Sequence, residues 1–568
     1  MNRAIKTLCL ILILSICQRI KSQENTTINN NELEEIYIKH SIQHPSDILF
    51  QDIRPFSYRQ VYSMLWDREL SDFNLFDKNV FPYVNYEFSN KGIAKEAIIR
   101  MNKKTHGFFY PNQGSFAQVD DTILSLKLNP IYEGSVGIES ASEGLRYRNT
   151  RGIELSGNIH KKVYFYTQIT ENQIRLFDYV KQYGTGFDNS NAYNFNPSFT
   201  YWKDINNNKG YDFLNSIGRL EYTPNNNFSI SIGHDRNHYG YGYRSLILGD
   251  NGAPYFSLKT DVNVWKFHYQ ALFAQLTGQY LRGADRLLPT KYGAFHLLSY
   301  KPSKKVELGI FEGVIFNRTN GFDLNYLNPL IFYRAIEHSL GSPDNVSIGL
   351  QTNYQPNRHL QVYTQFLLDD IQVGEFIKGT GWWGNKYAGQ LGMRWINMFN
   401  VNALSLQLEC NVVRPYTYSH STSDSGEDAN IDNFTHYNQP LAHPFGANFI
   451  ELHTRLSYQP YSRLKLDLIA NSSVRGQNVR SQNYGGDIFI NTDGNGLPQR
   501  YQNTIGQGNR NQVLYIMLRS QYQIYHNVFI DLDFIHRQNK DELFSSTSSS
   551  FGFMSGLRVN LRKRDNIF

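Results

Sequence analysis

Cysteine is nearly absent from this chain, and so are long apolar runs. Of the 568 residues only three are cysteine, and Cys9 and Cys17 lie at the very start, so Cys410 stands alone in the rest and an intrachain disulfide is excluded there. No stretch reaches the ~18 apolar residues that a membrane-spanning helix needs, and the mean hydropathy is -0.48. A disulfide framework and a helical membrane protein are therefore both excluded.

The net charge is also small once the first residues are set aside. Arg3 and Lys6 precede a short apolar run over 8–16, which is typical of a secretory signal peptide, and we expect residues 1–23 to be removed. Four basic residues of this leader account for most of the formal net charge of +6. The remaining chain is close to neutral, so neither nucleic acid nor a strongly anionic surface is expected as a partner.

Motifs for catalysis and metal binding are missing too. There is no G-x-S-x-G nucleophile elbow. His436 and His443 are seven residues apart and His420 is distant, which is not the short paired spacing of a zinc site. The sequence therefore predicts no enzyme, no cofactor and no metal site. A hydrolase built from serine and histidine inside a barrel stays open as an alternative.

What the chain does contain is a repeated alternation of apolar and polar residues. Over 401–413, leucines alternate with serine, glutamine, glutamate and asparagine, which indicates a strand with one apolar face. A long loop, a strand over 448–458, a tight turn and a strand over 463–474 follow. The 39 tyrosines and 37 phenylalanines suit strands and membrane-interface girdles. This pattern is typical of an outer-membrane β-barrel.

The same pattern extends over most of the chain. Long connections near 174–210, 235–255, 317–343, 371–384, 415–447 and 476–510 alternate strictly with short ones. A soluble β-sandwich would alternate along its strands without needing this asymmetry. The candidate strands are 119–129, 133–141, 150–158, 161–170, 213–222, 228–233, 256–261, 264–276, 291–300, 304–316, 344–354, 359–370, 385–396, 401–413, 448–458, 463–474, 512–523, 527–537 and 549–561.

Strand number and domain limits follow from this list. Single-chain bacterial barrels usually have an even number of strands. The list is odd and 119–129 has no partner leading up to it, so we predict an all-β, antiparallel transmembrane barrel of about 18 strands, with 16 or 20 as alternatives. It should occupy 119–568. Residues 24–118 form a lead-in, flexible over 24–45, and a small, partly helical segment that could plug the barrel.

Four blocks stand out for their density of polar and aromatic residues, and they resemble a known family. They span 233–259, 311–349, 367–392 and the paired segments 411–420 and 436–448, with YGYRSLILGDNGAP, RPYTYSH and HYNQPLAHP as the most specific stretches. These blocks resemble the Wzi family of capsule-attachment outer-membrane proteins, and most closely its Bacteroidota branch, which includes the gliding-motility protein RemB. The resemblance implies an 18-stranded barrel closed by a helical segment, acting as a surface lectin or adhesion component.

Two groups of residues in these blocks are candidates for function. Aromatic faces stack on sugar rings and polar groups bind hydroxyls, so the loops predict a carbohydrate site; a membrane girdle for the tryptophans and plain loop packing for the others are the alternatives. Its candidates are Trp382, Trp383, Asn385, Tyr416, Tyr418, His420, His436, Tyr437 and His443. Charged residues fit a polar network in the barrel lumen, and its candidates are His234, Asp235, Arg236, Glu312, Arg334, Glu337, Glu409 and Arg414.

The expected function is that of an outer-membrane surface protein. It would bind or anchor surface polysaccharide and support adhesion, capsule attachment or gliding motility. Its expected partners are outer-membrane lipid, surface polysaccharide, and gliding or capsule-export proteins. A pore for small solutes is the main alternative, which a barrel permits and a plug would forbid.

Overall fold

The structure is a computed structural model of the chain. It describes residues 31–46, 50–57, 115–121, 123–160, 162–185, 195–200, 202–205, 210–281, 287–318, 321–329, 332–341, 344–420, 431–479, 482–490, 497–563 and 565–567. The predicted signal peptide over 1–23 lies outside the described residues, as does most of the expected helical segment before residue 115.

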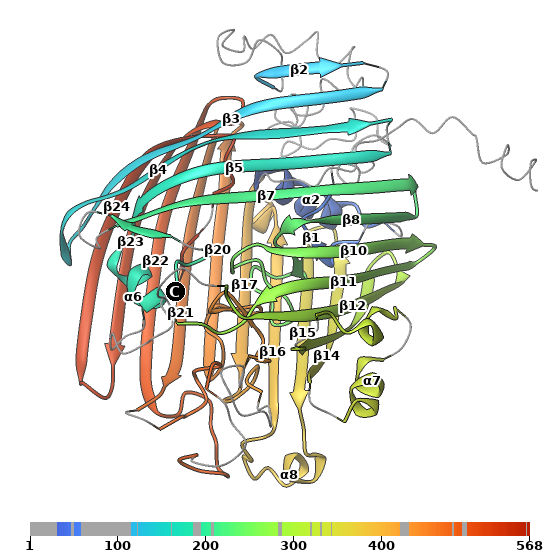
Figure 1. Cartoon of the computed structure of the whole chain (residues 1–568). Helices are drawn as coiled ribbons and strands as arrows, with labels where there is room; N and C mark the ends of the chain where they lie inside the picture. Colours follow the sequence, from blue (N-terminus) through green and yellow to red (C-terminus); the bar gives the residue numbers. More distant parts are fainter. Residues whose placement is uncertain are drawn as a thin grey trace, which may run out of the picture.

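Eighteen antiparallel strands close into one barrel (Figure 1), because the last strand pairs with the first. The predicted fold class is therefore confirmed. The strands are β3 (Leu124–Glu139), β4 (Ser142–Ile159), β5 (Val163–Arg175), β7 (Gly210–Asn225), β8 (Phe228–Asp235), β10 (Tyr255–Val264), β11 (Phe267–Thr277), β12 (Thr290–Ser303), β13 (Val306–Phe316), β14 (Asn345–Asn357), β15 (Leu360–Asp370), β16 (Lys386–Ile396), β17 (Leu404–Val413), β20 (Phe449–Tyr461), β21 (Leu464–Gln477), β22 (Asn509–Tyr525), β23 (Val528–Asp541) and β24 (Ser546–Val559).

Strand β3 explains the odd number in the sequence-based list. The candidates 119–129 and 133–141 are wrong as separate strands, because most of both belongs to this one strand of 16 residues. Pro130 lies inside it, between Leu128, where pairing with the short β2 (Ala117–Asp120) ends, and Tyr132, where pairing with β24 ends. A proline has no N–H to donate, so it fits a gap in the ladder.

The two faces of the barrel wall differ in chemistry. Leu298, Ile310 and Leu350 are cross-strand neighbours on β12, β13 and β14 and are 40%, 52% and 51% exposed. Residues of the opposite parity, such as Glu307 and Phe311, are buried inside. Apolar side chains thus face outward and meet lipid, as an outer-membrane barrel requires. None of the helices in the described part of the chain is long and apolar enough to cross a membrane.

Most connections alternate between short turns and long loops. Short turns face the periplasm in bacterial barrels, so the long loops are extracellular. Two connections on the long-loop side are short, however: residues 140–141 join β3 to β4, and 542–545 join β23 to β24. The predicted strict alternation is therefore wrong at these two hairpins. At these two hairpins the strands are 14 to 18 residues long, and the strands themselves extend the wall in place of a long loop.

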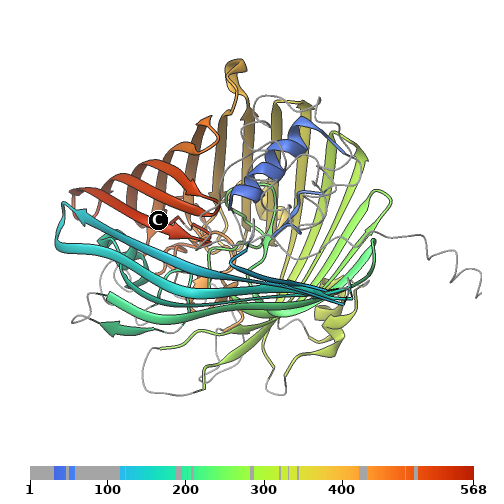
Figure 2. The same ribbon diagram turned by 90° about the horizontal axis from the view of Figure 1, so that it is seen from above.

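The N-terminal segment lies inside the barrel. Helix α2 (Asn31–Gln43) stands within the ring of strands (Figure 2), with Leu33 and Tyr37 fully buried. The expected flexible lead-in is wrong for this stretch. Acidic Glu32 and Glu34 occupy the first turn, where they match the positive end of the helix dipole. A two-stranded pairing of β1 (Ile53–Arg54) with β9 (His238–Tyr239) follows.

Ion pairs attach this segment to opposite parts of the wall. The Glu35 carboxylate pairs with Lys465 on β21 and, at 3.4 Å, with Arg455 on β20. The Asp52 carboxylate lies 2.9 Å from His268 Nδ1 on β11. These strands are separated along the barrel, so the segment spans the lumen rather than lining one side. Such buried ion pairs are stable because each charge has a partner. Removal of one partner would leave the other charge buried and unpaired.

The lumen contents lead to a conductance prediction. Helix α2, residues 50–57 and the loops described below occupy the interior from both ends, so the purified protein should conduct ions poorly in a planar bilayer. Deletion of 31–57 should still leave a low conductance, because the loops remain in place. Single-channel recording of the intact and truncated proteins is the test. A large, steady conductance of the intact protein would contradict the filled lumen.

Candidate functional site

The loop between β8 and β10 folds into the lumen. Residues 236–254, called the inner loop, carry Tyr239, Tyr241 and Leu246, all at most 2% exposed. Wall side chains satisfy its backbone: Gln365 on β15 donates to the Tyr239 carbonyl at 2.8 Å and accepts from the Leu246 N–H at 3.0 Å. A backbone inside a barrel must find such partners because water is scarce there.

A carboxylate at the centre of the wall completes this anchoring. Glu409 on β17 accepts the backbone N–H groups of Tyr243 and Arg244 at 2.7 and 3.0 Å. Asn411 bridges Glu409 to Glu451 on β20, with bonds of 3.0 and 2.9 Å. The Arg244 Nε lies 3.7 Å from Glu451, and its Nη2 donates to the Ile567 carbonyl at 2.7 Å. The inner loop, the wall and the C-terminal tail therefore share one polar centre.

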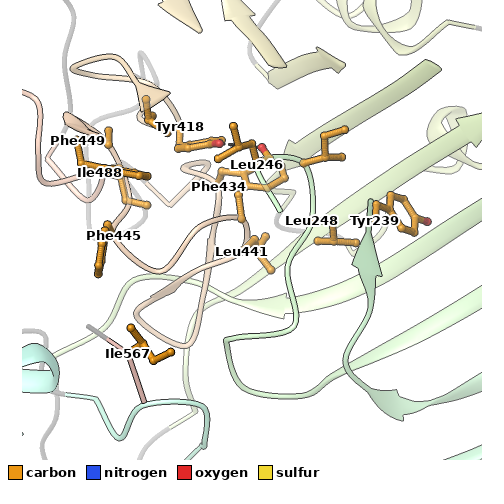
Figure 3. Packing of buried hydrophobic residues seen from close by; sticks show 14 of the residues in the cluster. Tyr239, Leu246, Leu248, Tyr418, Phe434, Leu441, Phe445, Phe449, Ile488 and Ile567 are labelled. Carbon is orange, nitrogen blue, oxygen red and sulfur yellow. Dashed lines mark hydrogen bonds between the residues drawn. The ribbon is translucent and has the colours of Figure 1, made fainter. Parts of the chain in front are cut away.

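A second loop packs beside the first. Residues 431–448 contain β18 (Thr435–His436) and β19 (Gln439–Pro440), and Lys291 on β12 holds them through four bonds of 2.7 to 3.0 Å to Ile431, Asn433 and Thr435. Figure 3 shows their apolar side chains meeting the inner loop. The Tyr418 hydroxyl donates to the Leu246 carbonyl at 2.7 Å there. The cluster joins Leu246, Leu248, Tyr418, Phe434, Leu441, Phe445, Phe449, Ile488 and Ile567.

The extracellular rim presents a different surface. Residues 380–383, which follow helix α8 (Val373–Ile377), pair with 500–503: the Trp383 N–H donates to the Arg500 carbonyl at 2.9 Å, and the Gln502 N–H donates to the Thr380 carbonyl at 2.8 Å. Tyr501 is 51% exposed, and Gln499, Arg500 and Gln502 are exposed as well. We call residues 380–383 and 499–503 the rim platform.

Two glycines allow the rim platform to form. Gly381 has φ 67°, and a Cβ there would lie 2.8 Å from the Gln502 Cα, so the two loops approach without a side chain between them. At Gly384 a Cβ would meet the Trp382 ring at 2.4 Å, so this indole folds over the glycine backbone. The rings of Trp382 and Trp383 lie 5.6 Å apart at 54°. The sequence G-W-W-G thus makes a compact, partly exposed aromatic pair.

The structure separates the predicted carbohydrate residues into two sets. Five of them are at most 4% exposed and already bonded inside the protein: Asn385, Tyr416, Tyr418, His436 and His443. For example, the Tyr416 hydroxyl donates to the Asn483 carbonyl at 3.0 Å, and His443 Nε2 lies 2.6 Å from the Glu451 carboxylate. Direct contact with a sugar is excluded for these five in this structure. Trp382, Trp383, His420 and Tyr437 are partly exposed and keep the prediction.

The predicted lumen network is also divided. Asp235 pairs with Arg219, Arg236 donates to the Gly252 carbonyl at 2.7 Å, and Glu409 anchors the inner loop, so these three lie inside. The lumen prediction is wrong for the others. His234 has the same parity as lipid-facing Ile232, and Glu312 the same as Ile310. Glu312 receives the Arg334 N–H outside the wall, where Arg334 and Glu337 form their own pair.

Arg414 is the last residue for which the lumen prediction is wrong. The Arg414 guanidinium lies 5.3 Å from the ring of Tyr387, which has the outward parity of exposed Leu391, so it too is outside the lumen.

Residues 499–502 of the rim platform are not among the candidates that the sequence predicts. Their tyrosine, arginine and glutamines in a long extracellular loop were a usable signal, but nothing in the sequence linked them to 380–383. Among the described residues, no group of His, Cys, Asp or Glu could hold a metal ion.

Comparison with known proteins supports the fold. No family model and no curated protein matches the chain. The solved structure of Wzi from Escherichia coli, described as a carbohydrate-binding β-barrel involved in group 1 capsule assembly, matches with a TM-score of 0.56 at 11% identity over 94% of this chain and 99% of that one.

Porin structures are similar to a smaller extent. OccK8 (OprE) of Pseudomonas aeruginosa has a TM-score of 0.39 at 11% identity, over 76% of this chain and 97% of that one. OccAB2 of Acinetobacter baumannii has 0.40 at 8%, also over 76% and 97%. This chain is an outer-membrane β-barrel of bacterial type.

The two tyrosines Tyr416 and Tyr501 lead to a stability prediction. Tyr416 is 1% exposed and its ring meets Trp383 edge-on at 6.1 Å. Tyr416→Ala should therefore lower the free energy of unfolding by about 3–5 kcal/mol, the usual cost of removing a large buried ring. Tyr501→Ala is the matched control and should stay within about 0.5 kcal/mol. Urea unfolding in detergent or vesicles measures both, and equal effects would show that Tyr416 is not a packing residue.

A buried histidine of the second loop gives a pH prediction. Thr277 N–H donates to His436 Nδ1 at 2.9 Å, and His436 Nε2 lies 3.2 Å from the Pro254 carbonyl. Burial lowers the pKa of His436 to about 3, from 6.5. Between these values the unfolded state binds more protons, so the free energy of unfolding must fall as the pH drops below about 6.5.

The matched variants separate this histidine from the others. His436→Gln retains an acceptor and a donor but cannot be protonated, so its stability should depend less on pH between 7 and 4. His338→Gln, at a side chain that is exposed in the fold, should keep the parent dependence. Urea unfolding at several pH values is the measurement. Parallel curves for the parent and His436→Gln would contradict the role of His436.

Proposed function

We propose that this protein binds a surface polysaccharide at the rim platform and acts as a binding protein rather than as an enzyme or a pore. The observation that carries the proposal is that loops and the N-terminal segment fill the lumen, so the extracellular rim is the surface left for a large ligand. The fold similarity to Wzi, itself described as carbohydrate-binding, supports the same ligand class.

The chemistry of the rim platform suits a sugar chain. Partly exposed indoles of Trp382 and Trp383 offer apolar faces for the C–H side of a ring. The exposed Gln502 side chain offers an amide donor and acceptor for hydroxyls, whereas Gln499 Nε2 already donates to the Gln502 carbonyl and to Gln507 Oε1, both at 3.2 Å, and offers its amide oxygen as an acceptor. The exposed Arg500 guanidinium adds a positive charge that suits a carboxylate. Backbone pairing between the loops holds these groups before binding, which reduces the entropy lost on association. A carboxylate-bearing polysaccharide is therefore the favoured class.

Finer roles rest on the sequence resemblance. Attachment of a capsule, adhesion and gliding motility are all compatible with binding of a polysaccharide at the cell surface, and gliding or capsule-export proteins remain proposed partners. The pore alternative is disfavoured by the filled lumen, because an open path would need displacement of the Glu409-anchored inner loop.

The rim platform gives a binding prediction with a matched control. Trp383→Ala should weaken binding of polysaccharide prepared from the producing strain by about tenfold or more, since lost aromatic anchors commonly cost ~1–3 kcal/mol. Trp265→Ala removes another tryptophan, 68% exposed at the short turn between β10 and β11 on the opposite side, and should bind as the parent does. Calorimetry or a glycan array measures the affinity. Unchanged binding by a correctly folded Trp383→Ala protein would place the site elsewhere.

A further inference from the structure

One long connection folds outward rather than into the lumen or along the rim. It joins β13 to β14 and contains η3 (Leu324–Leu327) and α7 (Tyr333–Ser339). Figure 1 shows α7 beside the wall near β12 and β14. We call the described residues of 317–344 the outer module. Its side chains Tyr326, Tyr333 and Ile336 form a separate apolar cluster with outward-facing residues of the wall. These wall residues are Ala294, Val314, Phe316 and Val346.

The wall beneath the outer module breaks the apolar pattern of the barrel. Leu298, Ile310 and Leu350 form an exposed apolar row. The next row of outward-facing residues lies two positions along each strand towards the long loops. It contains His296, Glu312 and Ile348. Ile348 is 41% exposed, whereas His296 and Glu312 are 8% and 5% exposed. A carboxylate and an imidazole thus stand next to lipid-facing residues, where an uncovered polar group would be costly.

The outer module covers both polar groups and satisfies them. The Tyr333 hydroxyl lies 2.5 Å from His296 Nε2. The Arg334 N–H donates to the Glu312 carboxylate at 3.2 Å, and the Tyr269 hydroxyl of β11 donates to the Pro329 carbonyl at 2.7 Å. Because the covered row continues into exposed Ile348, the covering residues lie next to the apolar band itself.

The exposed surface of the module carries several large apolar side chains, alongside polar Asn325, His338 and Ser339. Leu324 is 74% exposed, Phe332 71%, Leu327 39% and Leu340 37%. The Arg334 side chain is half-exposed beside them and pairs with Glu337 at 2.9 Å. Such a surface matches acyl chains with anionic head groups above them, since a long arginine can keep its charge at the polar boundary.

We propose that the outer module is immersed in the outer leaflet, where Leu324, Phe332 and their apolar neighbours contact lipid acyl chains. The lipid-facing band of the barrel is continuous with this surface, and that continuity favours lipid over a protein partner. The inference is independent of the proposed polysaccharide site, because it concerns the wall and not the rim platform.

Site-directed spin labelling tests the proposal on the full-length protein in vesicles. Single cysteines at Phe332→Cys and Leu324→Cys, in a Cys410→Ser background, carry a nitroxide label. Ile310→Cys is the lipid-facing reference and Tyr501→Cys the aqueous one. All four side chains are exposed in the fold, so the labels should not disturb folding. Collisions with oxygen, which concentrates in lipid, are compared with collisions with a water-soluble nickel chelate.

The expected result is that labels at 332 and 324 behave like the label at 310, with high oxygen and low chelate accessibility. Chelate accessibility equal to that of the label at 501 would show a module above the membrane and overturn the proposal. Low accessibility to both reagents would show a protein surface covering the module, as a second copy would, and would overturn it as well.

Discussion

The interaction between Arg244 and Glu451 inside the barrel is the constraint on which the rest of the interior depends. Glu451 is fully buried, and its charge is tolerable only because Arg244, His443, Asn411 and Asn471 surround it. Arg244 comes from the inner loop and also binds the C-terminal tail. Wall, loop and tail are therefore stable together or not at all, since each supplies charges or donors that the others leave unsatisfied.

The barrel could be predicted from the sequence because alternation reports which side of a wall each residue faces. No comparable periodicity in the sequence shows whether a loop folds into the lumen or outward. Leu246–Leu248 form an apolar run that a loop in water would not need, and such a run in a long connection indicates inward folding. Glu312 shares the parity of Ile310, so its outward direction was readable too; only the presence of α7 makes a carboxylate acceptable there.

The rim platform shows the same limit at longer range. The G-W-W-G stretch stood out in the sequence, yet its partner Asn503 lies 122 residues from Gly381. Local patterns specify the glycines and the aromatic pair, whereas only the closed barrel brings the two loops together. The buried members of the predicted site, such as Tyr418 and His443, have the residue types of a sugar site but serve the interior. Composition alone does not separate these two uses of tyrosine and histidine.

Lys291 illustrates a further property of this interior. Its ammonium lies among four oxygens at 2.7 to 3.0 Å and is fully buried, an environment close to the oxygen shell of a dehydrated potassium ion. The Lys291 ammonium thus takes the place of a bound cation, and the wall strand β12 presents it to the loop at 431–435. Closure of that loop therefore uses a cation that is covalently part of the chain and cannot exchange with the surrounding solution.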